Sequence, residues 1–174
     1  VRDRLIGAAS LEELKQGARV GTSSPRRAAQ LQRARADLQI VPLRGNVATR
    51  LAHIQNVDAD ATLLAAAGLD RLDMSEVGAA LPLSQFLPAA SQGAVGIDRL
   101  TSRTELVPFL AAINDVDTFV AVHAERALLE ALGGNCHSPI AALAQGEGSQ
   151  IRLKAEVFTA DGAEMHAGEI VYAA

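Results

Sequence analysis

The segment Arg19-Val-Gly-Thr-Ser-Ser-Pro-Arg-Arg27 predicts a short strand that passes directly into a helix. We expect the strand over Arg19–Thr22. Ser24 suits the N-cap position of the helix, because its side-chain oxygen can accept a hydrogen bond from a free backbone amide of the first turn. Pro25 suits the first helical position, where a missing N–H has no cost. The helix is then expected to run to about Arg35, which makes a strand–helix unit the starting point of the fold.

The same alternation continues along the first half of the chain. The apolar run Ala61–Ala66 is too short for a core helix and suits a buried parallel strand. The other expected elements are a short helix from the Ser10-Leu-Glu-Glu13 capping box to Gly17, a strand at Leu38–Leu43, a helix at Val47–Gln55 after the Gly45-Asn46 turn, and a Gly68–Leu72 turn that enters a further helix. This order predicts a doubly wound α/β domain, in which ligands bind at the carboxyl ends of the strands.

The second half predicts a smaller α+β domain. An apolar stripe at helical spacing predicts a long helix from an Asp117 cap to about Leu132. The other expected elements are a linker at 81–92, a strand at Ala94–Ile97, a helix at Ser102–Ile113 and, after Gly133-Gly134, strands at Ile140–Ala144, Gln150–Thr159 and Glu164–Tyr172. Turn signals such as Asp161-Gly162 predict that the last three strands form an antiparallel sheet with the long helix packed on it. We therefore divide the chain into an α/β domain at 1–90, a crossover at 91–112 and an α+β domain at 113–174.

Composition restricts the function classes. The 174 residues are 49% hydrophobic and 21% charged, which is ordinary for a globular protein. A single cysteine excludes an internal disulfide framework and fits a reducing compartment, so we expect a cytoplasmic protein. No apolar run approaches the ~18 residues of a membrane-spanning helix, and no set of His, Cys, Asp or Glu has metal-ligand spacing. We expect neither a membrane nor a metal as partner.

Basic residues are concentrated in the first part of the chain. Eleven of the sixteen Lys and Arg residues lie within residues 1–72, although the net charge of the whole chain is −4. They stand at separate motif positions rather than in the runs or stripes of a nucleic-acid binder. We therefore expect a small polyanionic ligand and no nucleic acid. Most are arginines, whose planar guanidinium group can donate two hydrogen bonds to one carboxylate.

Two arginine-bearing segments predict anion binding where a strand passes into a helix. The first contains Thr22, Ser23, Ser24, Arg26 and Arg27. A positive side chain in a first turn opposes the helix dipole unless an anion is bound, and three consecutive hydroxyl residues supply donors for one. The second has Arg44 and Gly45 at a strand end, with Arg50 in the following helix. Solvated surface arginines are the alternative, and no single arginine decides between the two interpretations.

Cys136 lies in the segment Gly133-Gly-Asn-Cys-His-Ser-Pro139, directly after the expected end of the long helix. A lone cysteine is often a small buried hydrophobic residue. The glycine-rich loop and the neighbouring His137 instead favour an accessible thiol, whose thiolate form a nearby positive charge stabilises. The residue types leave both interpretations open.

Six segments together resemble the hydroxymethylbilane synthase family, also called porphobilinogen deaminase, of tetrapyrrole biosynthesis. The segments are Gly21–Arg27, Leu43–Leu51, Leu64–Leu72, Ser91–Ile97, Ala124–Ala127 and Gly133–Ile140. They occur in the order and near the spacing of that family, across essentially the whole chain. One such segment alone is weak evidence, whereas six in order are specific.

The resemblance implies a monomeric three-domain transferase that joins four porphobilinogen molecules, with release of ammonia, on a dipyrromethane primer. This chain is similar to the second and third domains, which implies a doubly wound periplasmic-binding-protein-like domain followed by a small α+β domain with a three-stranded antiparallel sheet. Cys136 matches the cysteine that holds the dipyrromethane cofactor by a thioether bond. The implied cofactor-binding residues are Thr22, Ser23, Ser24, Arg26, Arg27, Arg44 and Gly45, and the implied substrate-binding residues are Arg26, Arg50 and Arg71.

The family's first domain, which carries its catalytic aspartate, has no counterpart in this sequence. The resemblance therefore assigns no catalytic residue here and implies that the chain alone is inactive. Ala94–Ile97 would return to that domain, so we expect this segment to be exposed or rearranged. The sequence also departs from the family pattern at Pro25, where leucine is common, and at Ser91, in an element that usually reads Val-Gly-Gln-Gly. Two other functions remain open: a non-enzymatic carboxylate-binding module, and a thiol enzyme that uses Cys136 and His137.

Overall fold

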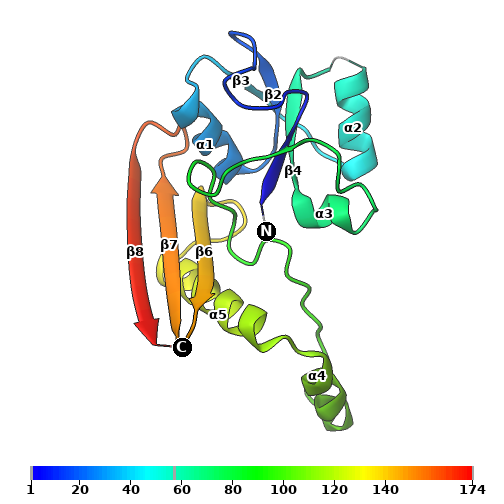
Figure 1. Cartoon of the computed structure of the whole chain (residues 1–174), viewed down its shortest axis with the longest axis vertical. Helices are drawn as coiled ribbons and strands as arrows, with labels where there is room; N and C mark the ends of the chain where they lie inside the picture. Colours follow the sequence, from blue (N-terminus) through cyan, green and yellow to red (C-terminus); the bar gives the residue numbers. More distant parts are fainter. Residues whose placement is uncertain (1, 57, 174) are drawn as a thin grey trace.

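Two β-sheets organise the chain, which a computed structural model describes at residues 2–56 and 58–173. The first sheet has five strands in the order β3-β2-β4-β1-β5, and the second has three in the order β6-β7-β8. Figure 1 shows the first sheet with helices α1, α2 and α3, the second sheet with helix α5, and helix α4 standing away from both. The predicted mixture of an α/β part and a three-stranded antiparallel part is confirmed.

The bounds of the elements follow the predicted order closely. The first sheet comprises β1 (Asp3–Ile6), β2 (Arg19–Gly21), β3 (Gln39–Val41), β4 (Ala61–Ala65) and β5 (Ala79–Ala80), with helices α1 (Pro25–Ala34), α2 (Val47–Gln55) and α3 (Ala66–Asp70). The remainder comprises the 3-10 turn η1 (Thr104–Leu106), α4 (Val107–Ile113), α5 (Val116–Ala131), β6 (Ile140–Glu147), β7 (Gln150–Phe158) and β8 (Met165–Ala173).

The first sheet is mixed rather than wholly parallel. Strand β2 pairs in parallel with β3 and with β4, as the strand–helix alternation predicts. Strand β1 pairs antiparallel with both β4 and β5, and neither β1 nor β5 was expected. These two strands are short, four and two residues, and they carry no periodic run that distinguishes a strand from a loop.

Helices cover both faces of the first sheet. On one face, Leu5 of β1 and Leu63 of β4 pack with Leu31 of α1 in the largest buried cluster. On the other face, their neighbours Ile6 and Leu64 pack against the α2 and α3 side of the sheet. The opposite orientation of successive side chains in a strand therefore gives each layer of helices its own core.

The segment 81–92, predicted as a linker, is an irregular, partly buried strap between the two sheets. Leu81, Phe86 and Leu87 are all buried, and Phe86 belongs to the same core cluster as Leu5. The backbone amide of Ala142 in β6 donates to the carbonyl oxygen of Pro88 at 2.9 Å. The segment is irregular and joins the two sheets, as the linker prediction expected, but its prolines gave no measure of its burial.

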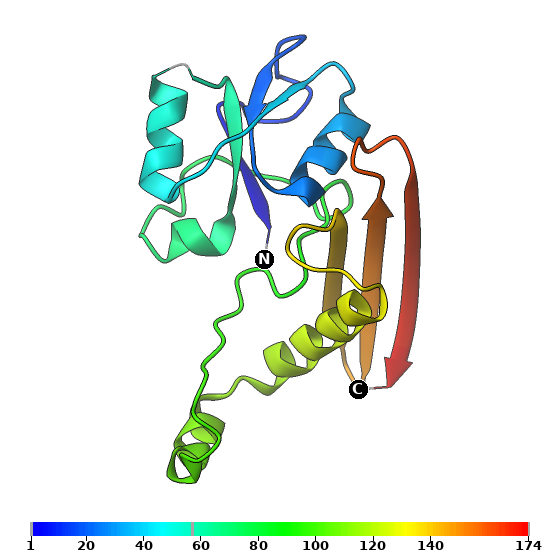
Figure 2. The same cartoon turned by 180° about the vertical axis from the view of Figure 1, so that it is seen from behind.

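The second sheet has its edge strand protected by this strap and by α5. Besides the Pro88 bond, the amide of Ala144 donates to Glu125 Oε1 at 2.8 Å, so two outward amides of β6 are satisfied. The turn between β7 and β8 packs on α1, where a Cβ at Gly162 would lie 2.3 Å from the carbonyl oxygen of Ala29. Figure 2 shows α1 beside the ends of β7 and β8 from behind.

Two predictions in the first half need correction. The Ser10–Glu13 capping box opens no helix: residues 10–17 form bends and turns, with Leu11 and Leu14 buried in the core. The amide of Ala9 does bond to Glu13, but too few residues precede Gly17 to sustain a helix nucleus. Helix α3 begins at Ala66, before Gly68 rather than after it, and the turn follows the helix.

Two predictions in the second half also need correction. The long helix begins two residues early, because Asp115 rather than Asp117 caps it and accepts a hydrogen bond from the amide of Thr118 at 2.8 Å. Ala94–Ile97 forms no strand and is exposed, with Val95 at 70% exposure. The expectation that this segment would be exposed or rearranged is confirmed. Among the described helices, none alone is long and apolar enough to cross a membrane; only the pair Thr104–Ile113 and Val116–Ala131, bent by 105°, reaches that length and composition together.

Ser91 introduces local strain into the strap. Its φ of 61° lies in the left-handed region that glycine adopts more readily, and its buried hydroxyl has no hydrogen-bond partner among the described residues. Its backbone amide donates to Glu125 Oε2 at 2.6 Å, which fixes this conformation.

We expect Ser91→Gly to stabilise the protein by about 1 kcal/mol, since it removes the strained Cβ and the unsatisfied hydroxyl. In a thermal unfolding measurement this corresponds to a rise in Tm of about 2–4 °C. Ser91→Ala is the control: it removes the hydroxyl, keeps the Cβ, and should gain less. A less stable Ser91→Gly variant would contradict this account of the strap.

Candidate anion-binding site

The three hydroxyl residues between β2 and α1 shape the start of the helix. Ser24 Oγ accepts a hydrogen bond from the amide of Arg27 at 3.4 Å, so the predicted N-cap is confirmed. Thr22 is buried, and its Oγ1 accepts from the amide of Ser24 at 3.2 Å. Ser23 is exposed and donates to the carbonyl oxygen of Leu43 at 3.0 Å, which ties this segment to the end of β3. The backbone that leads to the arginines is therefore fixed by its own hydrogen bonds.

Arg26 and Arg27 share a carboxylate that is wholly buried. Asp3 of β1 has no exposed surface, and its Oδ2 lies 2.8 Å from Arg26 Nη2. Its Oδ1 accepts from Arg27 Nη2 at 2.6 Å and from Arg27 Nε at 3.1 Å. We call Asp3, Arg26 and Arg27 the Asp3 cluster. Buried charges are tolerated when they are paired and hydrogen-bonded in this way.

Arg26 faces the interior. Only 3% of its surface is exposed, and besides Asp3 it donates to the carbonyl oxygen of Leu87 and to Gln30 Oε1, both at 2.8 Å, and to Gln92 Oε1 at 3.1 Å. Burial lowers the pKa of Arg26, and the charge of Asp3 partly offsets that effect. Arg26 therefore joins α1, β1 and the strap, and its terminal nitrogens are committed to protein partners.

Arg27 bonds to the protein through all three of its nitrogens but keeps some exposed surface. Its Nε and Nη2 point to Asp3, and its Nη1 donates to the carbonyl oxygen of Leu63 at 3.2 Å. Its side chain keeps 11% exposure. Arg27 thus lies at the boundary between the interior and solvent.

The second segment brings another arginine near Arg27. Gly45 has φ of 114°, and a Cβ there would lie 2.7 Å from the side chain of Thr49, so the turn into α2 requires glycine. Arg50 is half-buried and donates from Nε to the carbonyl oxygen of Gly45 at 3.0 Å. Burial lowers the pKa of Arg50, and the positive charge of Arg27 lowers it further. Two like charges within interaction distance favour the binding of an anion.

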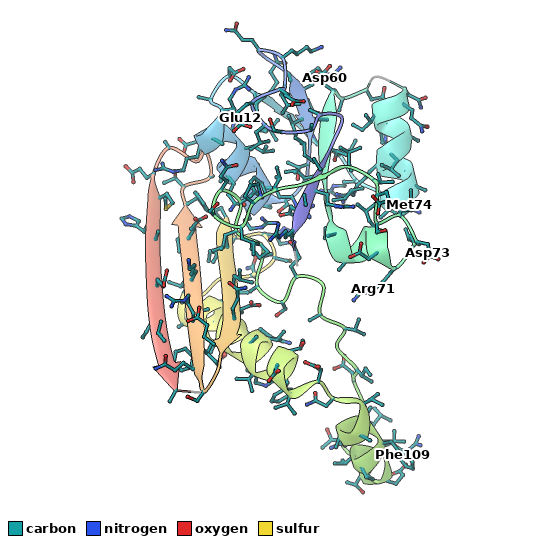
Figure 3. The ribbon with its side chains drawn as sticks, viewed as in Figure 1. Glu12, Asp60, Arg71, Asp73, Met74 and Phe109 are labelled. Carbon is teal, nitrogen blue, oxygen red and sulfur yellow. The ribbon has the colours of Figure 1, made fainter. Side chains whose placement is uncertain are left out.

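Arg44 and Arg71 are exposed at the ends of β3 and α3. No described residue forms a hydrogen bond or an ion pair with the guanidinium group of Arg44. Arg71 donates from Nη2 to the carbonyl oxygen of Gly93 at 2.7 Å, and Figure 3 shows it at the end of α3, pointing away from the sheet. Both arginines have nitrogen donors available to a ligand.

Cys136 lies in the turn between α5 and β6 and is exposed. The amide of Asn135 donates to Ser138 Oγ at 3.0 Å, and the amide of His137 donates to Asn135 Oδ1 at 2.8 Å, so the turn is ordered around the cysteine. The carbonyl oxygen of Pro139 accepts from the amide of Phe158, which fixes the far end of the turn to β7. The interpretation of Cys136 as a buried hydrophobic residue is therefore wrong.

The structure joins some predicted residues and separates others. Arg26 and Arg27 share Asp3, and Ser23 donates to the carbonyl oxygen of Leu43 just beyond β3. The positive charge of Arg27 also lowers the pKa of Arg50. No hydrogen bond or ion pair among the described residues links Cys136 or Arg44 to this group. An exposed thiol and arginines with free donors are groups that can hold a polycarboxylate tethered through sulfur.

The sequence alone did not place Asp3 and Gln92 in the site. Asp3 stands between Arg2 and Arg4, which suggests a solvated charged segment. A signal was present, because side chains two residues apart share a face and Leu5 is a core residue. The same alternation directs Asp3 inward.

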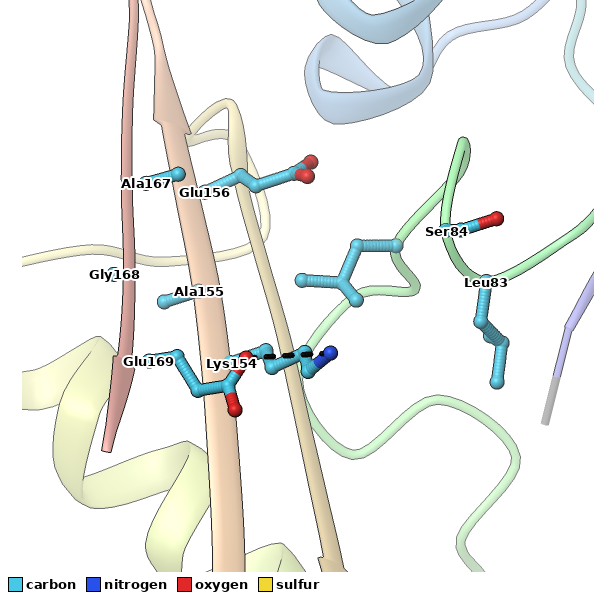
Figure 4. Close-up of a pocket in the computed structure, with 9 residues that line it drawn as sticks. Leu83, Ser84, Lys154, Ala155, Glu156, Ala167, Gly168 and Glu169 are labelled. Carbon is cyan, nitrogen blue, oxygen red and sulfur yellow. Dashed lines mark ion pairs between the residues drawn. The ribbon is translucent and has the colours of Figure 1, made fainter. Parts of the chain in front are cut away.

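Two grooves are lined by other residues. One has a volume of about 420 Å³ and lies between the strap and the second sheet, where Lys154 and Glu169 form an ion pair at 3.3 Å (Figure 4). Another, of about 620 Å³, lies between 94–98 and the helices α4 and α5. No predicted site residue lines either groove. Within the described residues, no group of three or more His, Cys, Asp or Glu is placed to hold a metal ion.

Two family models match the chain. Residues 1–107 match "Porphobilinogen deaminase, dipyromethane cofactor binding domain", and residues 119–172 match "Porphobilinogen deaminase, C-terminal domain". Relatives named porphobilinogen deaminase are 53% identical in Sphingopyxis alaskensis and 47% identical in Paracoccus denitrificans, each over 98% of this chain and 56% of the relative. One from Alkaliphilus metalliredigens is 44% identical over 88% of this chain and 49% of the relative. The chain thus spans about half the length of the curated relatives it matches.

Arg26 and Arg44 should respond very differently to substitution. Arg26→Gln leaves the buried Asp3 short of a partner, so we expect a loss of about 3–5 kcal/mol in the free energy of unfolding. Arg44→Gln, at an exposed position, should change it by less than about 0.5 kcal/mol. Urea unfolding followed by circular dichroism measures both. Equal effects of the two substitutions would contradict the inward role of Arg26.

Proposed function

Because the chain belongs to the porphobilinogen deaminase family, we propose that it forms the cofactor-bearing part of an enzyme that joins four porphobilinogen molecules into hydroxymethylbilane with release of ammonia. The observation that carries the proposal is the exposed thiol of Cys136 in the segment Gly133–Ile140, in a chain whose first 107 residues match the family's cofactor-binding domain. The reaction class is group transfer, and the chemistry requires a tether for the growing chain and a cationic surface for its carboxylates.

We propose that Cys136 Sγ holds the dipyrromethane cofactor through a thioether bond. The fit is supported by the exposure of the thiol and by the hydrogen bonds of Asn135 that order the turn around it. When bound, this group supplies the primer to which pyrrole units are added. The role of Cys136 is attachment, and a rigid turn fixes the position of the tether.

We propose that Arg27, Arg44, Arg50 and Arg71 bind carboxylates of the cofactor and the substrate. Each pyrrole ring carries an acetate and a propionate, so every added unit brings two negative charges. Guanidinium groups match carboxylates with paired hydrogen bonds, which a lysine cannot form. The exposed Ser23 and the turn at Gly45 lie on the same segments as these arginines, and Thr22 and Ser24 complete the proposed cofactor-binding set. Because Arg26 is buried, we propose a different role for it in the same set: it holds Asp3 and the strap in place and offers no free N–H group to the ligand.

We propose that the rest of the enzyme covers the exposed apolar surface of the crossover. Large apolar side chains between 95 and 119 are exposed; they are Val95, Ile97, Leu100, Val107, Phe109, Ile113, Val116 and Phe119. Figure 3 shows Phe109 on α4, far from both sheets. Apolar surface of this extent marks an interface. The match covers 56% of the relative from Sphingopyxis alaskensis, so the remaining part of that relative is long enough for the domain expected to supply the catalytic aspartate.

The domain division follows from the same proposal. We infer an α/β domain at 1–90 with a periplasmic-binding-protein-like arrangement, a crossover at 91–112 and an α+β domain at 113–174, in a monomeric enzyme. Helices on both faces of the first sheet support the first assignment, and the exposure of 94–98 supports the second. We expect this chain alone to release no hydroxymethylbilane from porphobilinogen.

The rival functions explain less of the molecule. A carboxylate-binding module accounts for the arginines but gives the exposed Cys136 no task. A thiol enzyme needs an imidazole that can take the thiol proton, and no hydrogen bond between Cys136 and His137 side chains is present among the described residues. It also leaves the arginine segments without a role.

Intact-protein mass spectrometry tests the attachment. In the complete enzyme, we expect a covalent adduct of two pyrrole units on wild-type protein and none on Cys136→Ser. Ser138→Ala is the control, because it alters the same turn and keeps the thiol, so its adduct should persist. An active wild-type enzyme with an unmodified, alkylatable Cys136 would contradict the proposal.

A further inference from the structure

We propose that Asp3 is a positioning residue, which holds Arg27 so that its two terminal nitrogens face the ligand. The inference rests on the proposed function, in which Arg27 binds a pyrrole carboxylate. Asp3 itself has no exposed surface and cannot touch that ligand, so it acts through Arg27 alone.

Two of the five N–H donors of Arg27 have no acceptor among the described residues. A guanidinium group has five N–H donors: one on Nε and two on each terminal nitrogen. Asp3 Oδ1 accepts from Nε and from Nη2, and the carbonyl oxygen of Leu63 accepts from Nη1. One N–H remains on Nη1 and one on Nη2. These two donors belong to adjacent nitrogens, which is the pattern that binds a carboxylate with two hydrogen bonds.

Arg26 shows the contrast within the same cluster. Each of its terminal nitrogens has two acceptors: Gln30 and Leu87 for Nη1, and Asp3 and Gln92 for Nη2. No terminal donor remains for a ligand. One carboxylate therefore holds two neighbouring arginines, of which Arg26 has no terminal N–H left for a ligand and Arg27 has two.

The backbone of Asp3 is held as firmly as its side chain. Asp3 of β1 is paired with Ala65 of β4, and the carbonyl oxygen of Asp3 accepts a hydrogen bond from the amide of Leu81 at 2.9 Å. Gln92 Nε2 donates to Oδ1 at 3.3 Å, which adds a neutral partner from the strap. A rigid carboxylate fixes Arg27 before the ligand arrives, so less side-chain entropy is lost on binding.

The charge balance leaves attraction for an anion. One carboxylate faces two guanidinium groups, so the cluster carries a net charge of +1. Burial, and then the positive charge of Arg27, lower the pKa of Arg50 in α2, so the two guanidinium groups repel each other in the absence of an anion. A ligand carboxylate between Arg27 and Arg50 would complete the pairing.

Binding of porphobilinogen to the complete enzyme tests the inference. Side-chain Nε–H signals of arginine, recorded by NMR during the titration, give the affinity and the state of Arg27 in one experiment. We expect Asp3→Asn to weaken binding about tenfold or more, as loss of one charge-assisted contact does, and to shift the Arg27 Nε–H signal. Asp60→Asn is the matched control: this aspartate pairs with Lys15 at the other end of β4 (Figure 3), and binding should not change.

A double-mutant cycle separates positioning from a general structural effect. If Asp3 acts through Arg27, then Asp3→Asn adds no further loss of affinity to Arg27→Gln. Should Asp3→Asn fail to fold because Arg26 is left unpaired, the charge-compensated pair Asp3→Asn with Arg26→Gln replaces it, and the same weakening is expected.

The outcomes distinguish this inference from the function on which it rests. Additive losses in the cycle, or full affinity in a folded Asp3 variant, would overturn the positioning role and leave the proposed function standing. A wild-type complete enzyme that shows no saturable binding of porphobilinogen would overturn both. A shifted Arg27 signal together with non-additive weakening supports the inference.

Discussion

The buried carboxylate of Asp3 is the constraint on which the rest of the structure depends. Isolation of a carboxylate from water costs several kcal/mol unless charged partners and hydrogen bonds compensate. Arg26 and Arg27 supply that compensation from the first turn of α1, and Gln92 supplies it from the strap. The compensation works only if β1, α1 and the strap hold one arrangement. A charged group in the core thereby selects a specific packing that apolar contacts alone would leave less defined.

The strap transmits this constraint to the second sheet. Arg26 and Gln30 both donate to the carbonyl oxygen of Leu87, and the next residue, Pro88, accepts from Ala142 of β6. Further along, Glu125 of α5 accepts from the amides of Ser91 and Ala144. Burial raises the pKa of Glu125, and these two amides oppose that shift. The helix and the strand on either side of the turn that bears the exposed thiol are thus connected through the strap to the Asp3 cluster.

Local signals in the sequence predicted local structure well. The Ser24 cap, the Gly45-Asn46 turn and the glycine stop after α5 predicted these helix ends correctly, because such signals satisfy or redirect backbone groups within a few residues. The hairpins of the second sheet were equally accessible from alternation and turn residues. Two local signals failed, the Ser10–Glu13 capping box and the Asp117 cap, and the remaining failures were non-local. The burial of the strap and the pairing of β1 and β5 depend on partners more than 50 residues away, and no short pattern encodes them.

The candidate site divides in the same way. Residue types at 22–27 and 44–50 predicted an anion-binding surface, yet they could not show that Arg26 turns inward while Arg27 keeps a free edge. That difference arises from Asp3, which the sequence places among surface-like charges.

A crystal structure of the complete enzyme with its cofactor attached tests the central claim most directly. We predict that Arg27 keeps its contact with Asp3 while Nη1 and Nη2 lie within hydrogen-bond distance of one pyrrole carboxylate, with Arg26 still enclosed. An Arg27 that has left Asp3 to reach the ligand, or that meets no carboxylate at all, would contradict the account.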